Sequence, residues 1–109
     1  MTDGVIGSLR HRVSIERPQR TATDGGAAVI SWTSLGSVFA RIEPVGGGEV
    51  EVADRQAGRV THKVLMRYRG DVLPEMRIVA GTRVLEISAA LDLDGRGRWL
   101  QCHCKEKLP

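Results

Sequence analysis

In residues 59–69, the sequence RVTHKVLMRYR alternates between two sets of side chains. One set is mostly apolar, namely Val60, His62, Val64, Met66 and Tyr68. The other is mostly polar or basic, namely Thr61, Lys63, Leu65, Arg67 and Arg69. Because successive side chains of a β-strand point to opposite faces, this period of two predicts a half-buried strand. It is the longest strand that the sequence predicts.

The same alternation recurs on both sides of this stretch. Proline and glycine end the shorter runs: Pro18 stops the first predicted strand, and Asp24-Gly25-Gly26 forms a turn. The predicted strands are 11–17, 27–35, 37–44, 59–69, a hairpin of 76–80 and 83–90, and 98–105. Short strands at this spacing predict a mainly β fold, a small barrel or sandwich of about six or seven antiparallel strands.

Composition limits the size and content of the fold. The chain has 109 residues, which suits one domain spanning residues 1–109. Only 4% of its residues are aromatic, so we expect a core of Val, Ile, Leu and Met. Met1–Ser8 lacks the apolar stretch of a signal peptide, and no apolar window is long enough to span a bilayer, so we expect no membrane partner.

One long loop, about residues 45–59, interrupts the pattern of strands. It begins with Gly46, Gly47 and Gly48 and continues with the acidic residues Glu49, Glu51 and Asp54. The stretch Glu49 to Gln56 is compatible with a short helix. Loops of about 15 residues are uncommon in compact domains, and are usually functional or disordered.

The sequence offers no convincing catalytic or cofactor site. In Cys102-His103-Cys104 the cysteines of a strand would face one way and the histidine the other, so the three cannot share a metal ion. Asp92-Leu93-Asp94-Gly95 lacks the later ligands of a calcium loop and is interpreted as a turn. The serines lie in no nucleophile motif, and Gly46–Gly48 lacks the lysine of a phosphate-binding loop. We therefore predict a protein that is not an enzyme and binds no metal or cofactor.

A candidate basic face consists of Lys63, Arg67 and Arg69. The formal net charge of +3 permits a nucleic-acid partner. A small nucleic-acid-binding β-barrel would also need exposed aromatic rings for stacking. The chain has four aromatic residues and some must fill the core, so an ordinary solvated face is the favoured interpretation, with the nucleic-acid-binding barrel as an alternative.

From about Leu9 to Lys107 the chain resembles the phage head–tail joining proteins, small connector proteins of long-tailed phages. The resemblance rests on the order and spacing of several segments, while the Cys102-His103-Cys104 tail departs from the pattern. The matching segments are LRHRVSIERP at 9–18, the Asp24–Gly26 turn with Trp32, VFARIEP at 38–44, THKVLMRYR at 61–69, MRIV at 76–79, RVLEI at 83–87 and RWL at 98–100.

This resemblance implies a structural role in a phage or a gene transfer agent. It implies a β-barrel-like subunit that assembles as a homo-oligomeric ring of six or twelve copies. The portal or adaptor ring would lie above it and the tail terminator or tail tube below, and packaged DNA would pass through the lumen without specific binding. Such head-completion, head-closure or stopper proteins seal the filled head and present a docking surface to the tail. The chain would be made in the host cytoplasm and assembled at the head–tail interface. Another connector ring, such as the adaptor or tail terminator, is an alternative.

Within that role the long loop is our candidate channel gate. The glycines Gly46, Gly47 and Gly48 would act as a hinge, and Val50 and Val52 would pack against neighbouring copies. The channel would be faced by Glu49, Glu51 and Asp54, whose carboxylates repel DNA phosphates. Arg55 completes the candidate gating loop.

Deleting Glu49–Gln56 tests the gate. Filled heads carrying this variant should lose packaged DNA, because the segment that blocks the lumen would be missing. The measurement is the DNA content of purified particles, compared with particles carrying the full chain. Unchanged DNA retention would contradict the gate.

Overall fold

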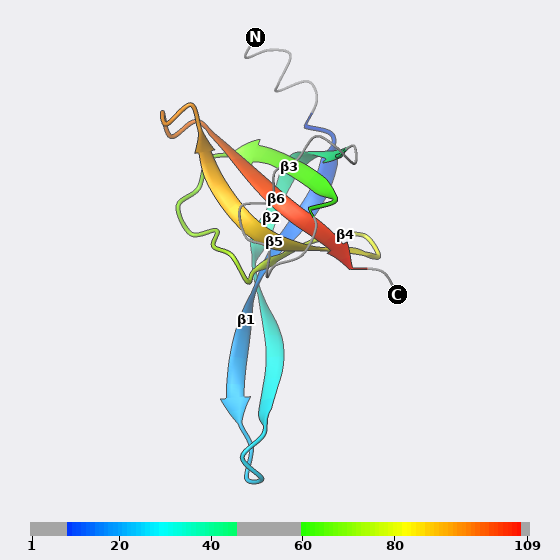
Figure 1. The fold of residues 1–109 in the computed structure, drawn as a ribbon, viewed down its shortest axis with the longest axis vertical. Coiled ribbons are helices and arrows are strands. Elements are labelled where there is room, and N and C mark those ends of the chain that lie inside the picture. The colour runs from blue at the N-terminus through cyan, green and yellow to red at the C-terminus, as the bar shows by residue number, and fades with distance from the viewer. Residues whose placement is uncertain (1–8, 46–59, 108–109) are drawn as a thin grey trace.

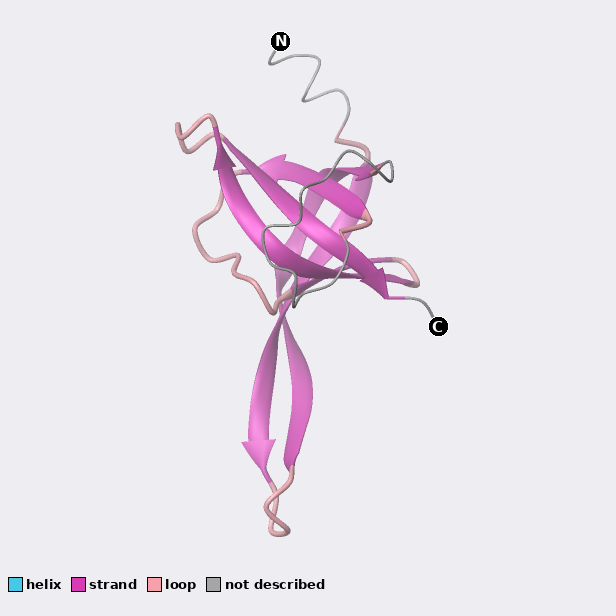
Figure 2. Ribbon diagram, viewed as in Figure 1, coloured by secondary structure: helices cyan, strands magenta, loops and turns pink. Residues whose placement is uncertain are grey.

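The computed structural model describes residues 9–45 and 60–107, and in this part of the chain six antiparallel strands close into a barrel (Figures 1 and 2). The order around the barrel is β1-β2-β3-β6-β5-β4. The strands are β1 (His11–Ala22), β2 (Ala28–Pro44), β3 (His62–Arg67), β4 (Arg77–Ala80), β5 (Arg83–Leu93) and β6 (Trp99–Lys107). The predicted mainly β barrel of six or seven strands is therefore confirmed.

The barrel interior is filled by aliphatic and cysteine side chains. One face of every strand contributes to it, as the alternating pattern requires. The largest side chains with less than 2% exposure are Val13, Ile15, Val64, Met66, Ile78, Leu85, Cys102 and Cys104. The predicted aliphatic core is confirmed, and the two cysteines share its face as expected.

The prediction that Pro18 ends the first strand was wrong. β1 continues through Pro18, which pairs with Trp32 of β2. Only Ser14, Ile15 and Glu16 of β1 also pair with β4, so from Arg17 onward no described strand pairs with the other edge of β1. A proline lacks one backbone donor, and an edge strand tolerates that loss.

The two strands predicted at 27–35 and 37–44 form one strand, β2. Pairing of β1 with β2 continues across Gly36, with a register shift that sets Leu35 and Gly36 against Ile15 alone. Gly36 has a φ of 113°, which only glycine adopts readily. The glycine therefore makes a β-bulge inside a strand rather than ending it.

Beyond this bulge the two strands leave the barrel as a hairpin, which we call the arm (residues 17–33). The arm extends away from the barrel in Figure 1, and the long axis of the molecule measures 53 Å against 31 and 27 Å for the others. At its tip Thr23 accepts a backbone hydrogen bond from Gly26 and donates one to Ala27.

The longest strand is β2 with 17 residues, and β3 has only six, so the prediction of a long strand at 59–69 was wrong. β3 lies between β2 and β6; its residues His62–Met66 pair with both neighbours and Arg67 pairs with β6 alone. The alternation of residues 59–69 predicts on which face of the sheet each side chain lies. It does not predict whether a neighbouring strand is there to pair with the backbone.

The remaining elements follow the prediction closely. The hairpin of β4 and β5 turns at Gly81, whose φ of 63° suits this turn. β5 runs three residues further than expected, and β6 ends at Lys107. The predicted long loop, about residues 45–59, lies outside the described residues apart from residue 45.

Truncating a core side chain should destabilise the barrel. Ile78→Ala removes a fully buried side chain and should lower the free energy of unfolding by about 2–5 kcal/mol. The matched control is Leu73→Ala, because Leu73 is 56% exposed and its loss should cost no more than about 0.5 kcal/mol. Urea unfolding followed by circular dichroism measures both; equal effects would contradict this description of the core.

Candidate interaction surfaces

The arm has one polar face and one largely apolar face. Cross-strand partners lie on the same face, so the register assigns each side chain to a side. The pairs Arg17–Thr33, Gln19–Ser31 and Thr21–Val29 make the polar face. The pairs Pro18–Trp32, Arg20–Ile30 and Ala22–Ala28 make the other, which we call the apolar face of the arm.

Two neighbouring residues mark the difference between these faces. Val29 and Ile30 are 54% and 49% exposed, and they point to opposite sides of the hairpin. Ile30 lies next to Trp32 and Pro18 on the apolar face, whereas Val29 lies among hydroxyl and amide groups. Pro18, Ile30 and Trp32 thus form one apolar patch beside Arg20; Arg77 of β4 covers part of Trp32, whereas Ile30 remains half exposed.

Trp32 attaches the base of the arm to the barrel. The guanidinium carbon of Arg77 lies 4.0 Å from the centroid of the Trp32 ring, a cation–π contact. The Arg77 Nε donates to Glu16 Oε1 at 2.7 Å. Because Arg77 belongs to β4 and Glu16 to β1, these contacts fix the direction in which the arm leaves the barrel.

A second surface crosses the outside of the barrel on its other side. Cross-strand pairing places Arg12 beside Phe39 on β1 and β2. It also places Trp99 of β6 between Arg67 of β3 and Leu93 of β5. Phe39 and Arg67 line one hollow, which connects the two groups. The guanidinium carbons of Arg12 and Arg67 lie 5.7 and 5.5 Å from the ring centroids of Phe39 and Trp99. We call these five residues the cation–aromatic row.

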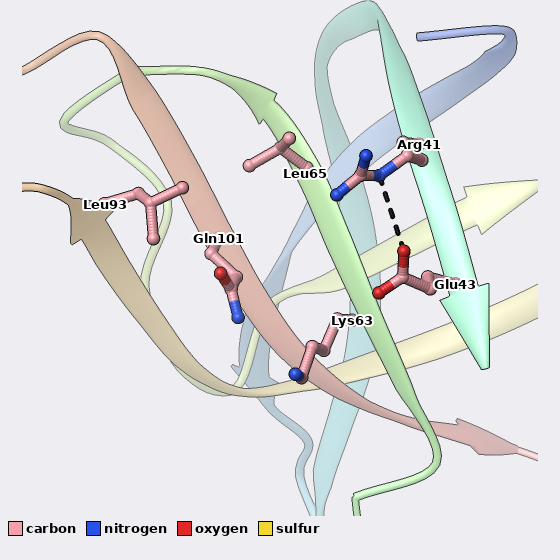
Figure 3. Close-up of a pocket in the computed structure, with 6 residues that line it drawn as sticks. All are labelled: Arg41, Glu43, Lys63, Leu65, Leu93 and Gln101. Carbon is pink, nitrogen blue, oxygen red and sulfur yellow. Dashed lines mark ion pairs between the residues drawn. The ribbon is translucent and has the colours of Figure 1, made fainter. Parts of the chain in front are cut away.

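A polar hollow adjoins this row on β2, β3, β5 and β6 (Figure 3). Arg41 and Glu43 form an ion pair at its edge, with Nε and Oε2 3.6 Å apart. Its other lining residues are Lys63, Leu65, Leu93 and Gln101. Exposed apolar and basic side chains therefore occupy one continuous part of the outer wall.

A polar cluster occupies the end of the barrel at which residues 45 and 60 lie. Arg83 holds both Glu106 oxygens, at 3.0 Å from Nε and 3.2 Å from Nη2, and its Nη2 is 3.3 Å from His62 Nε2. Since arginine can only donate, His62 Nε2 accepts, and His62 Nδ1 is then the protonated nitrogen that donates to Thr61 Oγ1 at 2.9 Å. Glu106 N also donates to Thr61 Oγ1, at 2.8 Å. The cluster ties β3, β5 and β6 together at this end of the barrel.

The predicted basic face is divided by the structure. Lys63 and Arg67 lie on the outer wall of β3, where Arg67 belongs to the cation–aromatic row. Arg69 lies beyond the strand and forms a bidentate pair with Asp71, at 2.6 and 2.8 Å, while its Nη2 also donates to the carbonyl of Leu35. The hydrogen bonds with Arg69 lower the pKa of Asp71. Whether Lys63 and Arg67 have a binding role stays a prediction, and the candidate gate, Gly46 to Arg55, lies outside the described residues.

The cysteines are buried thiols. Burial raises the pKa of Cys102 to about 12 and raises that of Cys104 further. His103 lies on the other face of β6, where burial and the nearby Lys63 lower its pKa. Within residues 9–45 and 60–107 no three His, Cys, Asp or Glu side chains are placed to hold a metal ion. No helix that could span a membrane occurs in this part of the chain.

Sequence reasoning missed the arm and the cation–aromatic row. The alternation of 27–35 held a signal for the arm, because a strand with exposed Val29 and Ile30 on opposite sides cannot bury both in one core. The row held no such signal, because its members come from five different strands.

A barrel with a filled interior, an arm with an apolar face and an exposed apolar and basic outer wall is the form of a small assembly protein, one that acts through contacts with other macromolecules. The profile of the phage head completion protein family matches residues 5–107, and the chain belongs to this family. It is a structural protein of phage-type particles, in agreement with the resemblance found in its sequence.

Two solved structures share the fold. The solution structure of a protein from Shigella flexneri 2a is 27% identical, with a TM-score of 0.72, covering 93% of this chain and 95% of the other. A chain in the virion of a native gene transfer agent particle is 23% identical, with a TM-score of 0.68 and coverages of 93% and 97%. The chain matches no curated protein.

The cluster at the barrel end predicts a specific response to acid. Hydrogen bonds from Arg83 hold the pKa of Glu106 below its ordinary value of 4.5. The unfolded chain therefore takes up this proton first, so the stability due to the pair is present above pH 4.5 and is lost as the pH falls through the folded pKa. Glu106→Gln should lower the stability at neutral pH and reduce its loss on going to about pH 3.

Urea unfolding at the two pH values measures this difference. Glu75→Gln is the control, because Glu75 is exposed and lies outside the cluster, and it should keep the acid dependence of the wild type. If Glu106→Gln also kept that dependence, the pair would not contribute to acid sensitivity.

Proposed function

We propose that this chain is a head-closure protein that forms a ring between the portal or adaptor and the tail. In this position it retains packaged DNA and provides the surface to which the tail, or the next ring, binds. Membership of the phage head completion proteins supports this role. The similarity of fold to a chain of a gene transfer agent virion agrees with it.

The observation that carries the proposal is the arm with its apolar face. A two-stranded hairpin alone is at best marginally stable in water, and apolar residues on it gain nothing unless something covers them. In the free chain, Ile30 is half exposed. A partner in an adjoining ring would bury it together with Trp32 and Pro18. The length of the arm lets it reach beyond the ring in which its own barrel lies.

The edges of the arm offer a second means of contact. From Arg17 onward β1 pairs only with β2, and β2 pairs with β3 only from Ala40. Both edges of the arm therefore carry backbone groups that a strand of another protein can pair with. Edge pairing and the apolar face together suit a joint between rings.

This role requires contacts rather than catalysis, so we propose that the chain is not an enzyme. A nucleic-acid-binding barrel is less well supported by the geometry. Such a barrel stacks bases on open aromatic rings. Here Arg12 and Arg67 lie over Phe39 and Trp99, and Trp99 is only 7% exposed.

A charge on the apolar face of the arm should prevent head–tail joining. Ile30→Asp places a carboxylate in the contact that we propose, whereas the matched control Val29→Asp places one on the polar face of the same hairpin. Neither should unfold the barrel, because both residues are about half exposed and remote from the core. Each variant would replace the wild-type chain in a knockout of its gene, and electron microscopy would count tailed particles.

We expect Ile30→Asp to yield free tails beside tailless heads, with tailed particles reduced at least about tenfold, and Val29→Asp to stay near wild type. Equal numbers of tailed particles for the two variants would contradict docking through the apolar face. Normal particles from the knockout itself would contradict the head-closure role, and co-purification with free tails rather than heads would instead indicate a tail terminator.

A further inference from the structure

We propose that neighbouring copies in the ring contact each other through opposite sides of the barrel. The cation–aromatic row of one copy would bind the acidic side of the next copy, formed by Glu16, Glu75 and Glu86. This inference rests on the ring proposed above and names the surfaces that build it.

The topology places the two surfaces correctly for a ring. In the closed order β1-β2-β3-β6-β5-β4, two strands lie between β6 and β1 in either direction, and likewise between β3 and β4, so these pairs lie on opposite sides of the barrel. The row is centred on β3 and β6, and the acidic side on β1, β4 and the start of β5. A contact between two different surfaces of one chain is heterologous, and it closes into a ring when the rotation permits.

The cation–aromatic row presents fixed cations beside apolar surface. Stacking on Trp99 and Phe39 holds the guanidiniums of Arg67 and Arg12 in place, so less side-chain entropy is lost when they bind. A stacked guanidinium keeps N–H groups at its rim for a carboxylate. Phe39 is 54% and Leu93 36% exposed, so the row offers the mixture of aromatic, aliphatic and arginine side chains that is typical of protein interfaces.

The acidic side offers the matching groups. Glu16, Arg77 and Glu86 lie in register across β1, β4 and β5. Arg77 is already engaged by Glu16 and Trp32. Glu75 and Glu86 line a hollow together with Trp32, Ile87, Ser88 and Lys105, the cross-strand partner of Glu86. Neither carboxylate forms an ion pair with another described residue. Two available carboxylates and an apolar floor thus face outward from this side.

Charge also disfavours the other contacts between copies. Placing one cation–aromatic row on another would bring arginines together, and the arm carries Arg17 and Arg20, which would meet the same repulsion. The side with Glu75 and Glu86, where the two carboxylates outnumber Lys105, complements the row in sign. The competing occupant of the row is the DNA phosphate backbone.

A charge swap distinguishes a second copy from DNA. Arg67→Glu and Glu86→Arg should each reduce tailed particles about tenfold or more, because each sets like charges against each other. The double variant restores opposite charges across the contact and should recover most of the loss. If the row bound DNA instead, Arg67→Glu would still reduce the number of tailed particles, but Glu86→Arg would leave it unchanged. The double variant would then give no more tailed particles than Arg67→Glu alone.

Cysteine cross-linking measures the contact directly. Particles carrying the pair Phe39→Cys and Glu86→Cys should give a ladder of disulfide-linked multimers on mild oxidation. Phe39→Cys alone can give at most dimers and is the control. Cys102 and Cys104 are fully buried, so they do not contribute.

The outcomes separate this inference from the function on which it depends. If tailless heads result from the knockout but neither rescue nor ladder is seen, these surfaces do not form the ring contact, and the head-closure role stands. If the wild-type chain is absent from the head–tail joint, the proposed function itself fails.

Discussion

Closure of the barrel between β1 and β4 is the constraint on which the other features depend. Only Ser14, Ile15 and Glu16 make this pairing, yet it turns an open sheet into a barrel and buries Ile15 completely. Closure removes the sheet edges of the barrel itself. It also gives the molecule two opposite outer sides, without which the acidic side and the cation–aromatic row would share one face.

The bulge at Leu35 and Gly36 divides β2 into a part that belongs to the arm and a part that belongs to the barrel. On one side of it the strand belongs to the barrel, with Ala40 fully buried, and on the other it belongs to the arm. Because the bulge lies opposite Ile15, the arm departs next to the closing contact. The stack of Arg77 on Trp32 then links the direction of the arm to β4. Movement of the arm relative to the barrel would have to break this stack.

The distribution of polar groups accords with a protein that works in an assembly. Groups that hold the barrel together are paired internally, as in the bidentate contacts of Arg83 with Glu106 and of Arg69 with Asp71. Most of the large exposed apolar residues lie instead on the arm and on the outer wall of β2 and β5, with Tyr68 and Leu73 between β3 and β4. Stability and association are thereby assigned to different residues, so a surface substitution can be used to test association without unfolding the barrel.

The sequence by itself determined which side chains face the core, that the core is aliphatic, where the β4–β5 hairpin turns and to which family the chain belongs. These properties follow from alternation and local turn chemistry, which act over a few residues. Tertiary structure alone decided that β1 passes through Pro18, that β2 is one strand, that β3 is short and that Arg69 donates to the carbonyl of Leu35. It also brought Arg12, Phe39, Arg67 and Trp99 together. The physical reason is that a period of two specifies the side of a strand, whereas its length and its neighbours depend on register with strands far away in the chain.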